Sequence, residues 1–297
     1  MAIIDTSITT FEIKKTVPQT GIDSVNNRQT IFYECLQLES FTVEEGNLNF
    51  AVHDGILYNK DMTEMIEVPL AIKGSITILN GVTTIGPEAF EYRRNLTSVV
   101  IPDSVTSIGD YAFSGCSNLM SVMIGNGVTS IGYLAFGSCK SLTSVMIPDS
   151  VTSIGDYAFM NCLSLISIEI PDSVMNIGKN AFDSCTSLTS ITIPDGIPSI
   201  GSYAFSYCSS LTSVTIGNGV TSIGGSAFYN CSSLTSVTIG NGVTRIGDSV
   251  FSYCDNLTSI TFDGTMEQWH NIDKSWYWDD FSYIETVICS DGVISLN

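Results

Sequence analysis

The nine cysteines are the most chemically reactive side chains in this chain of 297 residues, and eight of them share one sequence context. Cys35 lies three residues after Phe32, while Cys289 lacks this context. The remaining seven each lie three residues after a phenylalanine and recur at one constant interval: Cys116, Cys139, Cys162, Cys185, Cys208, Cys231 and Cys254. Thiols at a regular spacing could pack in a core, form disulfides or bind a metal.

Three interpretations of the cysteine series stay open. The favoured one is a row of small buried side chains whose S–H groups donate to loop carbonyls. Disulfides between neighbours are compatible with a spacing of about 4.8 Å, although parallel Cα–Cβ directions would oppose them. Zinc requires ligands that converge on a tetrahedron, whereas a row of thiols does not converge. We therefore expect no metal site among the cysteines.

Other chemistry has little support in the sequence. His53 and His270 lie at opposite ends of the chain, and no third group completes a nucleophilic set with any Ser or Asp. Acidic residues recur at Asp149, Asp172 and Asp195, where calcium could relieve the repulsion between stacked carboxylates. The favoured interpretation is that these residues form turns through local hydrogen bonds. We expect neither an enzyme nor a cofactor.

The charge excludes further partners. The chain carries 30 acidic against 11 basic side chains, a net charge of −19, which argues against binding to nucleic acid or an anionic membrane. Hydrophobic residues make up 44%, enough for a core. No apolar run approaches the roughly 18 residues of a membrane helix. Residues 1–20 contain no apolar signal core, so we expect no secretory signal in this sequence.

An internal repeat with a period of about 23 residues must position these side chains. Every repeat has isoleucine five residues before a phenylalanine, glycine four before it and leucine six after it. The phenylalanines are Phe90, Phe113, Phe136, Phe159, Phe182, Phe205, Phe228 and Phe251.

The unit at residues 102–124 shows the expected local structure. Alternation over 121–124 predicts a short strand with Val122 and Ile124 inward, and 105–108 predicts a second extended piece. Residues 110–116 are expected to form one helical or 3₁₀ turn. One unit cannot bury its apolar face alone, so the copies are expected to stack into a solenoid.

The repeat, as in "IPDSVTSIGDYAFSGCSNLMSVMI", resembles the BspA-type (Treponema-type) leucine-rich repeat. The resemblance implies a right-handed leucine-rich-repeat solenoid of the α/β repeat class with mostly short strands. The segment "VHDGILYNKDMTEMIEVPL" is expected to form a hairpin with its tip at 59–61. The predicted parts are an N-terminal extension or cap at 1–30, a degenerate repeat with the hairpin insertion at 31–75, eight repeats at 76–262 and a C-terminal cap at 263–297.

Outward strand positions supply the candidate binding site. The position ten residues after each phenylalanine is apolar in the first three repeats, glutamate at Glu169 and threonine in the C-terminal half. An exposed apolar cluster on a Ser/Thr face indicates a contact surface, and methionine adapts to varied partners. The alternatives are drift under weak constraint and cover by the hairpin. The candidate residues are Val100, Met120, Met123, Met146, Ile166 and Glu169.

Function follows from the resemblance, which implies adhesion or recognition. The first hypothesis is a cell-surface or secreted adhesin that binds a host or extracellular macromolecule, with a matrix or cell-surface protein such as fibronectin or fibrinogen as the expected ligand. The second is a receptor-binding tip of a phage tail or similar particle, and the third is an intracellular scaffold or effector. Trp269, Trp276 and Trp278 could form a sugar platform, but a cap over the last repeat is favoured, with a helix over 265–272.

Overall fold

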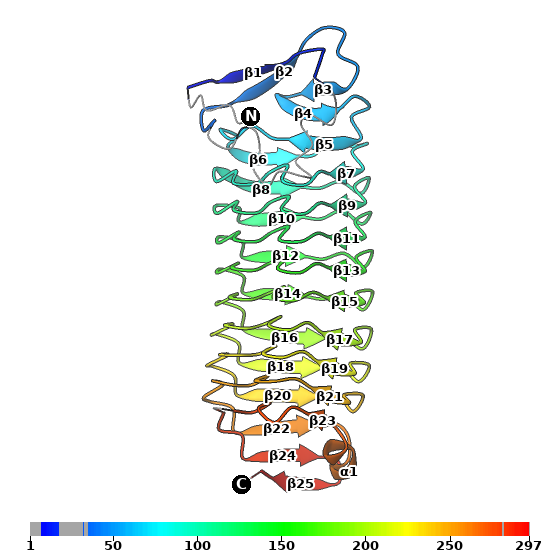
Figure 1. Cartoon of the computed structure of the whole chain (residues 1–297), viewed down its shortest axis with the longest axis vertical. Coiled ribbons are helices and arrows are strands. Elements are labelled where there is room, and N and C mark those ends of the chain that lie inside the picture. The colour runs from blue at the N-terminus through cyan, green and yellow to red at the C-terminus, as the bar shows by residue number, and fades with distance from the viewer. Residues whose placement is uncertain (1–6, 18–31, 33–34, 281, 297) are drawn as a thin grey trace.

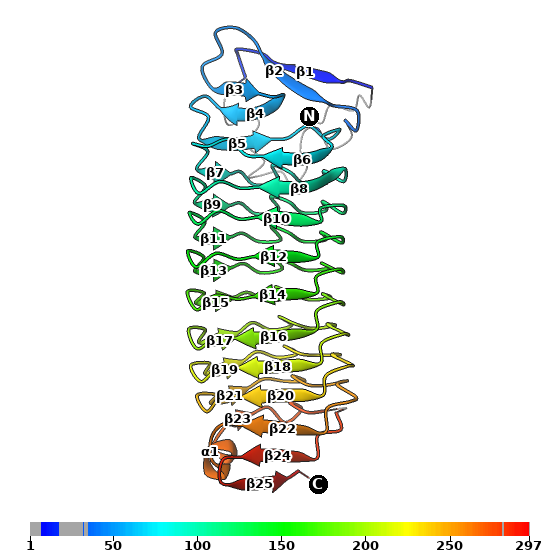
Figure 2. The same ribbon diagram turned by 180° about the vertical axis from the view of Figure 1, so that it is seen from behind.

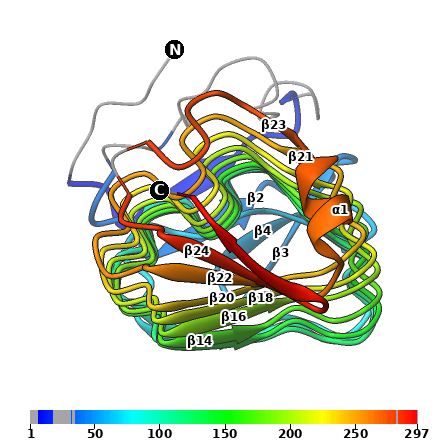
Figure 3. The same cartoon turned by 90° about the horizontal axis from the view of Figure 1, so that it is seen from below.

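The protein is a solenoid whose turns stack along one axis (Figure 1), as a computed structural model shows for residues 7–17, 32, 35–280 and 282–296. The N-terminal strands lie at one end and the C-terminal strands at the other (Figures 1 and 2). Seen along the axis, successive turns superimpose and enclose the core (Figure 3). Of the predicted extension at 1–30, only residues 7–17 lie inside the described part.

Two columns of parallel strands run the length of the solenoid. The first column is divided into two sheets. One contains β6 (Gly74–Thr77), β8 (Leu96–Val100), β10 (Ser121–Met123), β12 (Ser144–Met146) and β14 (Ser167–Glu169). The other contains β16 (Ser190–Ile193), β18 (Ser213–Ile216), β20 (Ser236–Ile239), β22 (Ser259–Phe262), β24 (Thr286–Cys289) and the antiparallel β25 (Gly292–Ser295).

The second column is one sheet, in which the strands of the repeats are only two residues long. Its parallel members are β7 (Thr84–Ile85), β9 (Ser107–Ile108), β11 (Ser130–Ile131), β13 (Ser153–Ile154), β15 (Asn176–Ile177), β17 (Ser199–Ile200), β19 (Ser222–Ile223), β21 (Arg245–Ile246) and β23 (Asp273–Lys274). Within the repeats, each strand pairs with its equivalent in the adjacent repeat, so equivalent side chains stack in rows.

The insertion before the repeats is a three-stranded antiparallel arrangement. β3 (Phe50–His53), β4 (Ile56–Asn59) and β5 (Glu64–Glu67) follow one another, and β5 then pairs in parallel with β7. A turn follows Asn59, where the hairpin tip is expected. A separate parallel pair, β1 (Thr10–Ile13) and β2 (Ser40–Val43), packs over a small second core.

Residues 110–116 and their equivalents, which are expected to form a helical or 3₁₀ turn, do not form a helix. Two residues in each such segment have positive φ, for example Tyr111 (58°) and Gly115 (71°). The left-handed residues turn alternate N–H groups along the solenoid axis, so Phe113 N donates to the Ala135 carbonyl at 2.7 Å. A helical turn would direct these donors into its own backbone. The segment therefore forms a third hydrogen-bonded ladder between repeats.

The core is a stack of identical side chains. Neighbouring repeat phenylalanines stack with ring centroids 4.5 to 5.7 Å apart, and all eight are fully buried. The nine cysteines are free and buried. Each of the seven periodic thiols donates to the carbonyl of the phenylalanine in the preceding repeat, as Cys139 Sγ does to Phe113 at 3.2 Å. The favoured interpretation of the cysteine series is confirmed.

The C-terminal end of the core is covered by aromatic residues. α1 (Met266–His270), the one helix in the described ranges, begins with a capping box at Thr265, within the region where a helix is expected. Trp269 packs edge-on against Phe262 and Trp278, and both tryptophans are buried. Trp276 is 96% exposed. Two of the three tryptophans therefore close the stack, as a cap requires.

The first column is interrupted between β14 and β16, and we name this junction the seam. These two strands belong to different sheets, and at the same level β15 and β17 pair through only Ile177 and Ile200. Pro198 lies in this repeat, where the other repeats have a donor such as Thr152 N, which bonds to Thr129 O at 2.9 Å. Pro194 also lacks a donor such as Gly217 N, which bonds to Ile193 O at 2.8 Å, but Pro102, Pro148 and Pro171 share this lack in other repeats. Two ladder donors are thus missing at one junction.

A buried polar cluster joins the insertion to the first repeat. The Arg93 guanidinium contacts the Glu67 carboxylate and donates from Nε to the Val68 carbonyl at 2.6 Å. Glu88 and Glu91 are buried beside this pair. Burial and the neighbouring Glu88 raise the pKa of Glu91 to about 7, although Arg93 acts in the opposite direction.

The cysteine arrangement predicts protection from thiol reagents. Burial raises the pKa of Cys116 and of Cys162 to about 12, so almost no thiolate is present at neutral pH. Without reductant, a chromogenic disulfide reagent should find about nine thiols after denaturation and almost none in minutes under native conditions. A single free thiol after denaturation would indicate four bridges and contradict this arrangement.

The seam predicts local differences in amide exchange. A missing ladder bond removes about 1 kcal/mol of local stabilisation, or roughly a fivefold difference in opening. Amide hydrogen exchange measured by mass spectrometry should be roughly fivefold faster in peptides covering 187–198 than in those covering 210–221. Equal rates in the two segments would show that the seam is as stable as the other junctions.

The buried carboxyl at Glu91 predicts a pH-dependent stability. Because its pKa is raised on folding, the folded state binds the proton more tightly, and this stabilisation is lost as pH rises from about 4.5 to about 7. Between pH 5 and 8, the free energy of unfolding should fall by about 2 kcal/mol less in Glu91→Gln than in wild type. The exposed control Asp255→Asn should leave the curve unchanged. Parallel curves for wild type and Glu91→Gln would contradict this origin.

Candidate functional site

The outward side chains of β8, β10, β12 and β14 form one continuous row. The pairing register places Met123 between Val100 and Met146, and Met146 next to Glu169. Met123 is 65% exposed and Met146 is 79% exposed, while Val100 is partly buried. Four of the six predicted residues are therefore neighbours on the first column.

The other two predicted residues are displaced from this row. Met120 and Ile166 are exposed, but each precedes the start of its strand, whereas Met123 and Glu169 end theirs. Thr143 separates them, since its N–H bonds to the Met120 carbonyl and its carbonyl accepts from Ile166 N. They share the face with the central row without joining it.

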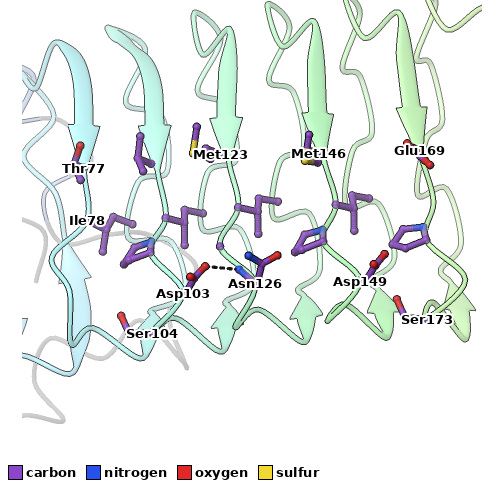
Figure 4. A pocket seen from close by; sticks show the side chains of 18 of the residues that line it. Thr77, Ile78, Asp103, Ser104, Met123, Asn126, Met146, Asp149, Glu169 and Ser173 are labelled. Atoms are coloured by element: carbon purple, nitrogen blue, oxygen red, sulfur yellow. Dashed lines mark hydrogen bonds between the residues drawn. The ribbon is translucent and has the colours of Figure 1, made fainter.

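A groove of about 1320 Å³ runs beside this row across five turns of the solenoid. One side, called the strand wall, consists of Thr77, Val100, Met123, Met146 and Glu169. The floor consists of Ile78, Ile101, Ile124, Ile147 and Ile170, all buried. The other side, called the turn wall, carries Asp103, Asn126, Asp149 and Asp172. Figure 4 shows the two walls along the row of isoleucines.

The groove follows directly from the repeat. The isoleucine after each strand turns inward, and a proline or glycine then redirects the chain, so the turn stands apart from the strand. Stacking repeats this step at every level and makes a groove. The sequence reveals the apolar row but not the groove, because the groove depends on how far the turn lies from the strand.

The groove is acidic. Its lining contains four carboxylates and no lysine or arginine. Asp103 accepts a hydrogen bond from Asn126 N at 2.7 Å, as Figure 4 shows. Within the described ranges, the side chains of Asp149, Glu169 and Asp172 take part in no hydrogen bond or ion pair. These three exposed carboxylates therefore face solvent across the apolar floor.

The insertion leaves the groove open. Its strands β3, β4 and β5 extend the second column, whereas the groove lies along the first. The exposure of Met123 and Met146 shows that no described segment covers them. A smaller groove of about 690 Å³ crosses the seam, and its lining includes Glu169, Asp172, Thr192 and Asp195.

Other candidate chemistry is not assembled in the part of the chain that the structure describes. No group of three His, Cys, Asp or Glu side chains there could hold a metal ion. Asp195 accepts a hydrogen bond from Asn218 N of the next repeat at 2.6 Å, so its contact runs between repeats and not within its own turn, where a local bond is expected. His53 on β3 and His270 on α1 lie at opposite ends of the solenoid (Figure 1). Within the described ranges, the structure contains no helix with the length and apolarity needed to cross a bilayer.

Comparisons with known proteins agree with the fold. A leucine-rich repeat protein from Bacteroides ovatus superimposes with a TM-score of 0.64 at 26% identity, over 82% of this chain and 69% of that one. A second, from Eubacterium ventriosum, gives a TM-score of 0.54 at 26% identity, over 68% of this chain. This chain spans 59% of that protein. No curated protein matches.

The family comparison covers most of the chain. Residues 69–189 and 152–282 match the BspA type leucine-rich repeat region. The two ranges overlap and contain every repeat whose phenylalanine lies in the stack. Leucine-rich repeat proteins are generally non-catalytic, and they typically mediate protein interactions. The chain belongs to the BspA-type leucine-rich repeat family.

Proposed function

We propose that this protein is a non-catalytic adhesin that binds a host or extracellular protein through the groove and its strand wall. The observation that carries the proposal is the pair Met123 and Met146, which are highly exposed beside an apolar floor. Solvent-exposed methionines in a row gain contact area when a partner covers them, and their flexible side chains fit varied surfaces.

Location at the cell surface or secretion is part of the same proposal. Proteins with BspA-type repeats are often surface-associated. A rigid stack with three hydrogen-bonded ladders suits an exposed recognition surface, because equivalent outward side chains are held at a fixed spacing.

Two substitutions on the strand wall test the proposal. The protein is immobilised, and its affinities for purified fibronectin and fibrinogen are measured by surface plasmon resonance. Wild type should bind at least one of them, and Met123→Asp with Met146→Asp should weaken that binding at least tenfold, because carboxylates would replace apolar contacts. The thermal midpoint should stay nearly unchanged, since both side chains are exposed.

A matched control separates the groove from general charge effects. Leu48→Asp with Met175→Asp adds the same charge at positions 81% and 66% exposed that lie outside the groove lining. This control should bind as wild type does. Unaltered affinity in the strand-wall variant, or an equal loss in the control, would contradict the proposed site, and no binding to either matrix protein would contradict the proposed ligand class.

A further inference from the structure

We propose that the groove binds an extended, basic segment of the partner, in which Lys or Arg alternates with apolar side chains. This inference rests on the proposed function and specifies the partner's chemistry. It is carried by the composition of the groove, which combines an apolar floor and the two methionines of the strand wall with carboxylates on the turn wall and at Glu169.

The dimensions of the groove fit an extended chain. Five stacked turns at a strand spacing of about 4.8 Å span roughly 19 Å from Thr77 to Glu169. An extended segment rises about 3.3 Å per residue, so about six residues fill that length. Its alternate side chains point to opposite sides. One set would therefore contact Met123 and Met146 while the other set faces the turn wall.

The charges select a basic segment. Asp149 and Asp172 occupy equivalent positions in adjacent repeats, about one strand spacing apart along the stack. Glu169 lies on the opposite wall from Asp149 (Figure 4). None of the three has a hydrogen-bonding or ionic partner in the described part of the chain. Lys or Arg side chains in the groove would relieve this repulsion, whereas an acidic segment would add to it.

The same charges disfavour a second copy of this chain as the occupant. The protein has a net charge of −19, and a contact between two such grooves would bring two sets of carboxylates together. A cation alone would leave the methionines uncovered. A basic segment with apolar side chains is the occupant that satisfies both walls.

Fluorescence anisotropy with three labelled peptides tests the inference on the full chain. The peptides are GKLKLKG, the acidic counterpart GELELEG and the basic but polar GKSKSKG. At about 0.1 M salt, GKLKLKG should bind at least tenfold more tightly than either of the others, and its affinity should fall at about 0.5 M salt. Equal affinities for GKLKLKG and GKSKSKG, or tighter binding of GELELEG, would overturn the inference.

Two triple variants locate the binding. Asp149→Asn with Glu169→Gln and Asp172→Asn should weaken GKLKLKG binding at least tenfold. The control triple, Asp61→Asn with Asp255→Asn and Asp280→Asn, removes three exposed charges outside the groove and should change it less than twofold. Circular dichroism checks that both variants remain folded.

The remaining outcomes are also decisive. An equal loss in the control triple would show general attraction to an acidic protein, and calorimetric binding of calcium alone that the groove triple abolishes would show a cation site. Either result overturns the inference. If the strand-wall variant loses binding to the matrix protein while the groove triple retains it, the inference fails and the proposed function stands.

Discussion

Backbone hydrogen bonding between successive turns is the constraint on which the rest of this structure depends. A single turn of the solenoid is too short to close a core of its own, so its N–H and C=O groups bond along the axis to the turns above and below. Three ladders do this: the two strand columns and the left-handed segment around each phenylalanine. All three require equivalent residues at one level, and the constant repeat length keeps those residues in register. The longer last turn also preserves the pairing, as β21 with β23 and β22 with β24 show.

The ladders explain the uniformity of the interior. Stacking at one strand spacing places each phenylalanine on the next, so a smaller side chain in one repeat would leave a cavity against two neighbours. The cysteines also join successive repeats, since each thiol donates a hydrogen bond to a buried carbonyl of the preceding repeat. The outward positions carry no such requirement. Their side chains can differ from one repeat to the next without disturbing the stack.

The periodic part of this fold is readable in the sequence because each core position repeats its residue type. The turn before each cysteine is misread as helical, since the left-handed conformation of residues such as Tyr111 and Ser138 depends on acceptors in the next repeat. The Glu67–Arg93 pair is also missed, because it joins the non-periodic insertion to a repeat and has no spacing to reveal it. The apolar row can be predicted from Met123 and Met146. The role of the turn wall cannot, because the sequence does not show that these residues line a groove.

The seam and the groove together divide the first column into two surfaces. The groove ends at Glu169 and Ser173, immediately before the repeat that contains both Pro194 and Pro198. Beyond it the outward row becomes Thr192, Thr215, Thr238 and Thr261, which offers hydroxyls in place of methionines. In a one-dimensional stack each repeat contacts only its neighbours, so a weak junction limits how far strain from one half passes to the other. A partner bound in the groove would therefore strain mainly the N-terminal half, while the capped C-terminal half keeps its own continuous sheet.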